Sequence, residues 1–305
     1  MGNSIEFPHS SFFFANLVLA YVTKSYAKLN RMESLNQNIE NHYLKEGLYE
    51  DIINRLKEQN IALDNVKRSD IAGADEFHVR GATVSKELAN SIQLNGLNVL
   101  DVGCGLGGPC RMLADEYNCQ TTGIDLSNEY IRTANKLSEL VNLNSKTTFI
   151  QGNATELPFE DNIFDVVWTQ HVQMNIPDKK KFYSEIKRVL KTGGYFLFYD
   201  ILKKGNGEVN YPMPWASTAN LSFLFKAEEM DGFLKEFGFT KEQSTNQTQA
   251  GIDFFDALVA RLKEFGPPKM GLNVLMGETT KPKLMNLLRH LKTGDLELKS
   301  GVYKK

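Results

Sequence analysis

One stretch of the sequence decides the fold. Residues 99–109 read Val-Leu-Asp-Val-Gly-Cys-Gly-Leu-Gly-Gly-Pro. The first four residues are typical of a buried strand, and Gly103, Gly105 and Gly108 have the G-x-G-x-x-G spacing of a nucleotide-binding turn. Glycine suits such a turn because it reaches positive φ and lets a ligand approach the backbone. The stretch therefore predicts a strand, a ligand-binding turn and a helix at the edge of a doubly wound sheet.

Short apolar runs alternate with helix-length segments around this stretch. The runs lie at residues 98–102, 121–124, 148–150, 164–168 and 195–199. This alternation is typical of βαβ units in a parallel sheet that is covered on both faces. Helical patterns follow at 227–236 and 249–264, and residues 296–303 are expected to close the sheet as an edge strand. We predict an α/β fold with a Rossmann-like, mostly parallel sheet and helices on both of its faces.

The chain is expected to divide into four parts. Residues 1–31 are interpreted as a loosely attached extension, because their apolar run is too short to span a bilayer and no basic residue precedes it as in a signal peptide. Residues 32–95 carry amphipathic helical patterns and form an N-terminal helical cover. Residues 96–203 form the ligand-binding core. Residues 204–305 complete this core and contribute lid insertions over the substrate.

Composition narrows the class of protein. The 305 residues include 35 Lys and Arg against 37 Asp and Glu, a net charge of −2 that argues against a nucleic-acid partner. Three cysteines are a poor disulfide framework, so a reducing, cytoplasmic location is expected, with Cys104 as a small filler. The five histidines are scattered without metal-binding spacing, so no metal is predicted. The apolar run near the N-terminus is too short to cross a bilayer, so no stable membrane span is predicted. The sequence assigns no oligomeric state.

Two acidic residues decide between ligands. Asp101 stands just before the glycine turn, where its carboxylate would repel a pyrophosphate. S-adenosylmethionine has no phosphate, and its ammonium group suits an acidic partner or an ordered water beside one. Asp125 ends the next apolar run, about 20 residues past Gly103, where a ribose diol takes a bidentate acceptor. Asp101 therefore favours S-adenosylmethionine over a dinucleotide, while Asp125 would serve either cofactor.

These residues resemble the class I S-adenosylmethionine-dependent methyltransferases, over roughly residues 75–200. The resemblance implies a seven-stranded sheet, S-adenosylmethionine as cofactor, and an adenine-reading loop at residues 152–159. The family usually has Asp where this chain has Asn153, and an amide can both accept and donate. The cofactor-binding residues that the resemblance implies are Asp101, Gly103, Gly105, Gly108, Asp125, Leu126, Asn153, Ala154 and Gln170.

Residues 169–175 follow the predicted fourth strand and read Thr-Gln-His-Val-Gln-Met-Asn. In this detail the chain resembles sarcosine/dimethylglycine N-methyltransferases and quinol methyltransferases. Because the carboxyl ends of parallel strands face the ligand, and imidazole titrates near working pH, His171 is the candidate general base. A structural role for His171 has equal support, since many methyltransferases need only proximity and alignment.

Four further residues are candidates to bind the substrate. His78 and Arg80 would bind a substrate carboxylate, or would instead pair with a neighbouring acid. Tyr211 and Trp215 would form an aromatic lid, or would belong to an ordinary packed loop. Tyr43 is expected in the core or the helical cover, with a smaller chance of entering the pocket.

The predicted function is methyl transfer from S-adenosylmethionine to a small molecule, first of all the nitrogen of a small amine such as sarcosine or dimethylglycine. The alternative is C- or O-methylation of a quinol, phenol or other apolar metabolite, for which Met213, Phe223 and Phe225 would supply an apolar slot. The chain lacks the Asn/Asp-Pro-Pro-Tyr motif and basic stripe of a nucleic-acid methyltransferase. Asp101 and Asn153 argue against a dehydrogenase, and a module that binds the cofactor without chemistry is a further alternative.

Overall fold

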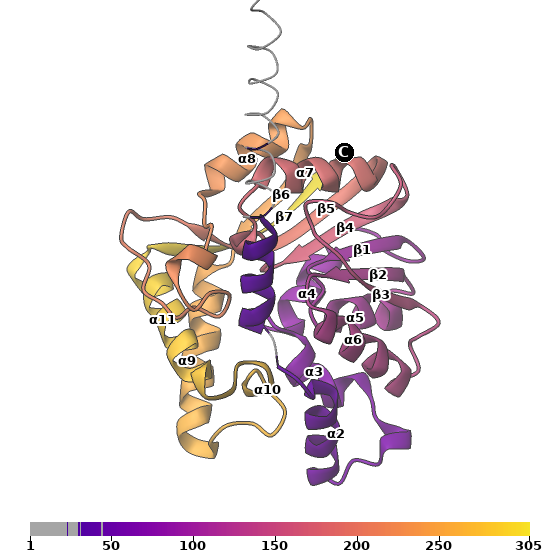
Figure 1. Cartoon of the computed structure of the whole chain (residues 1–305), viewed down its shortest axis with the longest axis vertical. Coiled ribbons are helices and arrows are strands. Elements are labelled where there is room, and N and C mark those ends of the chain that lie inside the picture. The colour runs from indigo at the N-terminus through magenta and orange to yellow at the C-terminus, as the bar shows by residue number, and fades with distance from the viewer. Residues whose placement is uncertain (1–22, 24–29, 31, 44) are drawn as a thin grey trace, which may run out of the picture.

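A computed structural model describes residues 23, 30, 32–43 and 45–305 of the chain. Its centre is a seven-stranded sheet in the order β3-β2-β1-β4-β5-β7-β6 (Figure 1). Strands β1 to β5 run parallel, β7 is antiparallel to β5, and β6 is antiparallel to β7. The predicted α/β, mostly parallel architecture is confirmed. The strands are β1 Asn98–Val102, β2 Gln120–Asp125, β3 Thr147–Gln151, β4 Phe164–Gln170, β5 Leu190–Lys203, β6 Thr240–Asn246 and β7 Leu296–Lys304.

Helices surround the sheet and precede it in the chain. A helix over residues 32–43, called the cover helix below, is the first fully described element. The α-helices that follow are α2 Leu48–Glu58, α3 Arg68–Asp75, α4 Ala82–Ala89, α5 Gly108–Glu116, α6 Asn128–Leu140, α7 Lys179–Val189, α8 Ala227–Glu236, α9 Thr248–Phe265, α10 Asn273–Met276 and α11 Thr280–Thr293. Short 3-10 turns lie at Leu63–Asn65, Gln173–Asn175, Ala219–Leu221 and Gly277–Thr279. The predicted extension, residues 1–31, lies outside the described residues except for Thr23 and Asn30.

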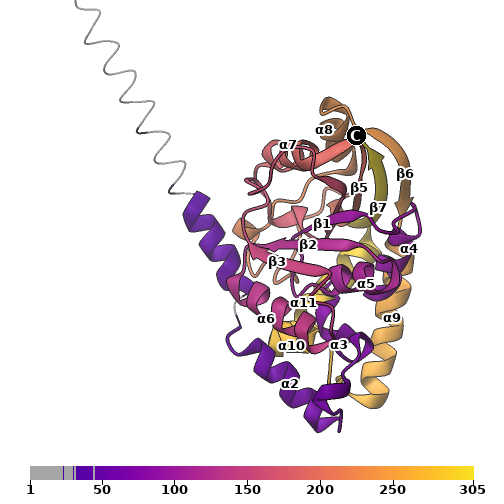
Figure 2. The same ribbon diagram turned by 90° about the vertical axis from the view of Figure 1, so that its right-hand side faces the viewer.

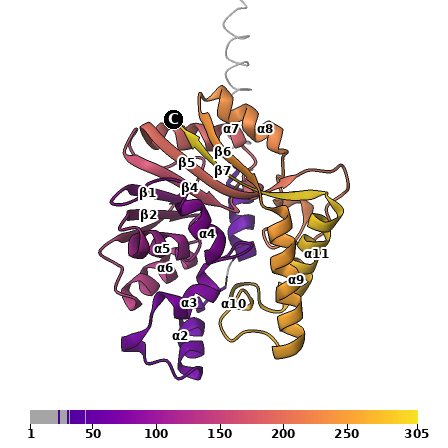
Figure 3. The same ribbon diagram turned by 180° about the vertical axis from the view of Figure 1, so that it is seen from behind.

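Alternate residues of the central strands point to two different cores. Val99, Val166 and Leu197 are buried on the face covered by α4, α5 and α9. Leu100 and Val167 are buried on the opposite face with α7 and α8. Figure 2 shows α7 at a distance from α4 and α9, and Figure 3 shows α9 beside α11. Because both faces are covered, the strands read as continuous apolar runs, which is why they were visible in the sequence.

The order of the last two strands corrects one expectation. Residues 296–303 were predicted as an edge strand, but β7 lies inside the sheet between β5 and β6. The edge is β6, whose residues are nearly all exposed. Its sequence, Thr-Lys-Glu-Gln-Ser-Thr-Asn, has no apolar residue. An edge strand with one neighbour and little burial needs none, so hydrophobic pattern does not reveal it.

The carboxyl ends of β1, β2 and β4 lie at the same edge of the sheet because these strands are parallel neighbours. The turn after β1 bends back sharply, with Gly103, Gly105 and Gly107 at φ values of 76°, 54° and 80°. A side chain at Gly107 would collide with the ring of Phe149, so glycine is required there for space as well as for conformation. This edge carries the candidate site. Within the described residues, no helix is both long and apolar enough to cross a membrane.

Candidate functional site

A cavity of about 150 Å³ opens at the carboxyl edge of β1, β2 and β4. The cover helix closes it from the other side, and Figure 2 shows this helix, in indigo, next to α6. Ten of the residues predicted from sequence line the cavity together. They are His78, Asp101, Gly103, Gly105, Asp125, Leu126, Asn153, Ala154, Gln170 and His171.

Asp125 is fixed by backbone groups on both sides. One carboxylate oxygen accepts a hydrogen bond from the Gly105 N–H at 3.0 Å, and the other accepts from the Ser127 N–H at 2.9 Å. Ser127 in turn caps α6, where its hydroxyl accepts from the Tyr130 N–H. Burial raises the pKa of Asp125, and the two N–H donors oppose that shift. Both oxygens keep a second lone pair for a ligand hydroxyl.

Asp101 lies deeper, at the end of β1, and is only 2% exposed. The Cys110 thiol donates to its carboxylate at 3.4 Å. Burial, with a contribution from Asp125, raises the pKa of Asp101 to about 7. Gly108 does not line the cavity but begins α5, where its Cα lies so close to the carbonyl of Asp75 that no side chain would fit. Its position is therefore explained by packing between α3 and α5.

Asn153 begins the loop between β3 and β4 and has one half of its amide already occupied. Its side-chain oxygen accepts from both the backbone N–H and the hydroxyl of Thr155, each at 2.9 Å. The amide nitrogen is the part left for a ligand, so Asn153 can act as a donor toward the cavity. A contact between Asn153 and adenine stays a prediction.

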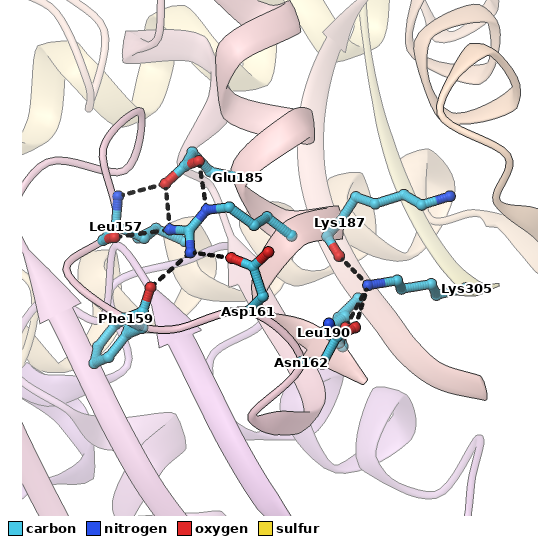
Figure 4. Close-up of polar contacts among 9 residues, drawn as sticks. Leu157, Phe159, Asp161, Asn162, Glu185, Lys187, Leu190 and Lys305 are labelled. Carbon is cyan, nitrogen blue, oxygen red and sulfur yellow. Dashed lines mark hydrogen bonds and ion pairs between the residues drawn. The ribbon is translucent and has the colours of Figure 1, made fainter. Parts of the chain in front are cut away.

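Arg188, in α7, binds the same loop, of which Figure 4 shows Leu157 and Phe159. Its guanidinium donates to the carbonyls of Phe159 and Leu157 at 2.6 and 2.9 Å, and to Asp161 at 2.9 Å. Glu185 accepts from Arg188 at 2.7 Å and from the Leu157 N–H at 2.8 Å. A second cation, Lys305, holds the end of the loop by donating to Asn162, to the Lys187 carbonyl of α7 and to the Leu190 carbonyl of β5. The loop at residues 152–159 is thus bound to α7, which packs against one face of the sheet.

His171 follows β4 in a left-handed backbone conformation, with φ of 54°. Its backbone N–H donates to the Tyr199 carbonyl at 2.8 Å, and its ring lies 4.9 Å from that of Tyr199. The Nε2 atom is buried and has no hydrogen-bond partner among the described residues. Burial, aided by His78, lowers the pKa of His171 well below its ordinary value. The imidazole is therefore neutral near pH 7.

A buried polar cluster backs the cavity next to His171, and we call its members, Glu76, His78, Ser85, Trp168 and Gln170, the polar cluster. The Ser85 hydroxyl lies 3.0 Å from a Glu76 oxygen, 3.0 Å from His78 Nε2 and 3.3 Å from the Gln170 side-chain oxygen. Trp168 Nε1 donates to the same Gln170 oxygen at 2.9 Å. Burial and Asp75 raise the pKa of Glu76 to about 8, and burial lowers the pKa of His78 to about 4. Glu76 and Ser85 were not expected from sequence, because their partner Gln170 is distant in the chain.

Three predicted substrate residues lie outside the cavity lining. Both terminal guanidinium nitrogens of Arg80 donate to Glu87, at 2.8 and 2.5 Å, and one also donates to Gln247. Trp215 is buried in the core, and its indole N–H donates to Ser222 at 2.9 Å. Tyr211 packs against the same core. The structure shows the acid pairing of Arg80 and the packed-loop contacts of Tyr211 and Trp215, and a contact of these residues with the substrate stays a prediction.

The cover helix supplies a wall of the cavity and belongs to the part of the chain predicted as a helical cover, although its lining residues were not named from the sequence. Met32, Leu35 and Ile39 line the cavity from this helix. Tyr43 also lines the cavity, which was the less favoured of the two expectations for this residue. Its hydroxyl donates to Asn175 at 2.9 Å. His42 Nε2 donates to the Pro214 carbonyl at 3.1 Å. The spacing of the apolar residues, three and four positions apart, was the available signal.

The three cysteines are free thiols whose burial disfavours the thiolate form. Cys104, Cys110 and Cys119 are free and buried. Burial raises the pKa of each thiol, to about 11 for Cys119. Only Cys104 lines the cavity. Among the described residues there is no group of three or more His, Cys, Asp or Glu side chains placed to hold a metal ion.

Comparison with known proteins agrees with this geometry. Residues 100–198 match the family model described as a methyltransferase domain. A sterol 24-C-methyltransferase of Gibberella zeae is 39% identical over 116 residues, which cover 38% of this chain and 30% of that protein. An ajmaline N-methyltransferase of Rauvolfia serpentina is 41% identical over 96 residues, covering 32% and 33%. The matches thus span about a third of the length of these relatives.

Solved structures share the fold at low sequence identity. A phosphoethanolamine N-methyltransferase of Haemonchus contortus has a TM-score of 0.65 and 20% identity, over 77% of this chain and 55% of that one. A Galdieria sulphuraria protein, described provisionally as a sarcosine dimethylglycine methyltransferase, has a TM-score of 0.61 and 22% identity, over 73% and 86%. The predicted resemblance to class I S-adenosylmethionine-dependent methyltransferases is confirmed by the match of residues 100–198 to a methyltransferase domain, and the solved structures share the fold.

Proposed function

We propose that this chain transfers a methyl group from S-adenosylmethionine to a small-molecule acceptor. The observation that carries the proposal is one cavity that combines Asp125, the turn at Gly103 and Gly105, and Asn153. The family match over residues 100–198 supports it independently. The relatives named above include enzymes named for C- and N-methylation, so the reaction class has more support than any particular acceptor.

The residues of the cavity fit the cofactor in chemical type. Asp125 offers the remaining lone pairs of its two oxygens to a ribose diol, and Asp101 offers a buried acid to an ammonium group. The Asn153 amide nitrogen can donate to an adenine ring nitrogen. A side chain added at Gly105 would meet no protein atom within 4 Å, so this part of the turn leaves room for a ligand. The bound cofactor would supply an electrophilic methyl group on a sulfonium.

The proton of the acceptor has a candidate destination in His171. The residue lines the cavity and its ring is neutral, because burial keeps its pKa low. A neutral imidazole can take the proton of an attacking hydroxyl, or the proton of the ammonium that forms when a neutral amine attacks the methyl carbon and the bond from that carbon to sulfur breaks. Val172, Ile176 and Pro177 of the same loop also line the cavity and would hold the acceptor close.

A small amine is the first acceptor that we propose, and its support lies in the acids of the cavity. Glu40 and Asp178 line it in addition to the aspartates already described. A carboxylate on that amine would find no contact with Arg80, because Glu87 and Gln247 already bind this guanidinium. An apolar phenol or quinol is the second candidate, because Leu35, Ile39 and Phe77 provide an apolar surface.

One experiment tests both levels of the proposal. Release of S-adenosylhomocysteine would be measured with glycine, sarcosine, dimethylglycine, simple amines, phenols and quinols as acceptors, beside calorimetric titrations with S-adenosylhomocysteine and NADH. Turnover with one class would identify the acceptor. Binding of S-adenosylhomocysteine without turnover of any compound would favour a module that binds the cofactor without this chemistry. Binding of NADH instead would contradict the proposal.

A further inference from the structure

The Ser85 hydroxyl occupies the centre of the polar cluster and faces more acceptors than it can serve. It lies 3.0 Å from the Glu76 oxygen and 3.3 Å from the Gln170 oxygen. A hydroxyl carries a single proton and can donate to only one of them at a time. His78 Nε2 adds no acceptor to the group, since it donates to the Gly81 carbonyl at 3.0 Å. At any moment, the Ser85 hydroxyl therefore donates either to Glu76 or to Gln170.

The protonation state of Glu76 decides this choice. When Glu76 is a neutral acid, its O–H can donate to Ser85, and Ser85 can donate to Gln170. Gln170 then accepts two hydrogen bonds at one oxygen, from Ser85 and from Trp168 Nε1. When Glu76 ionises, Ser85 is drawn to the carboxylate, since hydrogen bonds to charged acceptors are stronger. Gln170 then keeps only the bond from Trp168.

The nitrogen end of the Gln170 amide is left without a protein partner in the described part of the chain. Gln170 is 8% exposed and lines the cavity, yet its Nε2 atom is buried and has no partner among the described residues. A buried N–H group without a partner is costly, unless a ligand supplies the acceptor. The two donors at the oxygen fix the plane of the amide and so fix the direction in which Nε2 can donate.

We propose that Glu76 and Ser85 are positioning residues that hold the Gln170 amide in place for the cofactor, and that ionisation of Glu76 weakens cofactor binding. The inference rests on the proposed function, because it takes S-adenosylmethionine as the ligand of the cavity. It adds a dependence on pH that arises from residues behind the cavity wall, since Glu76 and Ser85 do not themselves line it.

The charges around Glu76 agree with a neutral acid at pH 7. Burial and the neighbouring Asp75 raise the pKa of Glu76 to about 8, while the Ser85 hydrogen bond and then Arg68 and Arg111 oppose the shift. Arg111 is bound to Asp75 at 2.7 Å, which offsets much of its charge. His78 contributes no positive charge at this pH, because burial lowers its pKa to about 4. Ser85 and Gln170, which face Glu76 from α4 and β4, are uncharged.

Calorimetric titration of the full chain with S-adenosylhomocysteine between pH 6.5 and pH 9 tests the proposal. The wild-type affinity, divided by that of Glu76→Gln at the same pH, should fall by about three- to tenfold, the range for one neutral hydrogen bond, with a midpoint near pH 8. This ratio cancels the titration of Asp101, whose pKa of about 7 lies in the same range and which both proteins retain. Glu76→Gln should keep its bond to Ser85 at every pH, because its amide N–H₂ can donate to Ser85 as the neutral acid does. An equal fall in both proteins would overturn the proposal.

Two further variants separate positioning from general damage. Ser85→Ala should weaken binding by about three- to tenfold already at pH 6.5, and unchanged affinity would overturn the proposal even if Glu76→Gln failed to fold. Asp165→Asn changes an acid at the opposite end of β4 and should leave the wild-type fall in place. Failure of the wild type to bind at any pH would contradict the proposed function itself, whereas binding without a pH-dependent difference would contradict only this inference.

Discussion

The floor and the roof of the cavity are held in different ways. The floor consists of turns that follow β1, β2 and β4, and its key carboxylate, Asp125, is bound on both oxygens by backbone N–H groups. The roof is the cover helix, whose described polar contacts to the sheet side are made by side chains near its end, such as Tyr43 to Asn175 and His42 to Pro214. The floor is thus part of the sheet, while the roof is attached to it.

This difference suggests that the floor recognises the cofactor and that the roof can move. Backbone-held groups keep their positions whether or not a ligand is present, as cofactor recognition requires. A helix held by a few side-chain bonds, each worth about 0.5–1.5 kcal/mol, and by the apolar contacts of Leu35, Ile39 and Tyr43 can be displaced without disturbing the sheet. We expect substitutions in the floor to have large effects on binding or turnover, and substitutions of roof contacts to have small ones.

The largest effect is expected where the floor meets the acceptor. His171→Asn should lower kcat by about a hundredfold, the contribution of a positioned base, with the affinity for S-adenosylhomocysteine retained. Asn is chosen because it tolerates the left-handed backbone at this position better than Ala does. Steady-state kinetics with an acceptor from the panel would measure the change. A rate equal to that of the wild type would return His171 to a structural role.

Within the floor proper, Asp125→Ala should weaken S-adenosylhomocysteine binding by at least about tenfold, because a bidentate contact to the ribose is lost. Calorimetry at pH 7 would measure the loss. Asp253→Ala, which removes an exposed acid of α9, is the matched control and should bind as the wild type does. Similar affinities of the Asp125 variant and the wild type would show that the ribose lies elsewhere.

For the roof, Tyr43→Phe should weaken S-adenosylhomocysteine binding only about threefold, since a single neutral hydrogen bond to Asn175 is removed. Tyr49→Phe is a suitable control, because Tyr49 lies on α2 and does not line the cavity. A loss for the Tyr43 variant as large as that for Asp125→Ala would remove the distinction between floor and roof.

The smallest effect is expected outside both walls. Arg80→Met breaks an ion pair with Glu87, which is 46% exposed and therefore contributes little to stability. Cofactor affinity and the KM for sarcosine, should sarcosine be a substrate, are expected to stay within about twofold of the wild type. A tenfold rise in that KM would show that Arg80 leaves Glu87 to bind the acceptor.

The floor could be predicted from sequence because its determinants are local. A strand, its glycine turn and an acid at the end of the next strand are spaced by covalent geometry, and parallel pairing then brings Asp101, Asp125 and Gln170 to one edge. The buried strands of both faces were visible for a similar reason, as continuous apolar runs. The exposed strand β6 was not, because nothing about its burial required apolar residues.

Contacts between distant segments were beyond reach of pattern alone. Whether Arg80 binds a substrate or an acid depends on where α4 begins, because Gly81 precedes that helix and Glu87 then faces Arg80. Trp215 lies in the core and not in a lid because its indole N–H binds Ser222 and its ring packs among buried residues from distant parts of the chain. Likewise, Glu76 acquires a possible role only once folding places it near Gln170 through Ser85.

The burial of every cysteine in the chain has a practical consequence for following the roof. Cys104, Cys110 and Cys119 are inaccessible, and the raised pKa of each thiol leaves little thiolate to react. A cysteine introduced at Gln37, on the exposed side of the cover helix, would be the fast-reacting thiol of the folded protein. A fluorophore or spin label could be attached there without first removing native cysteines, and would report on opening of the helix as ligands bind.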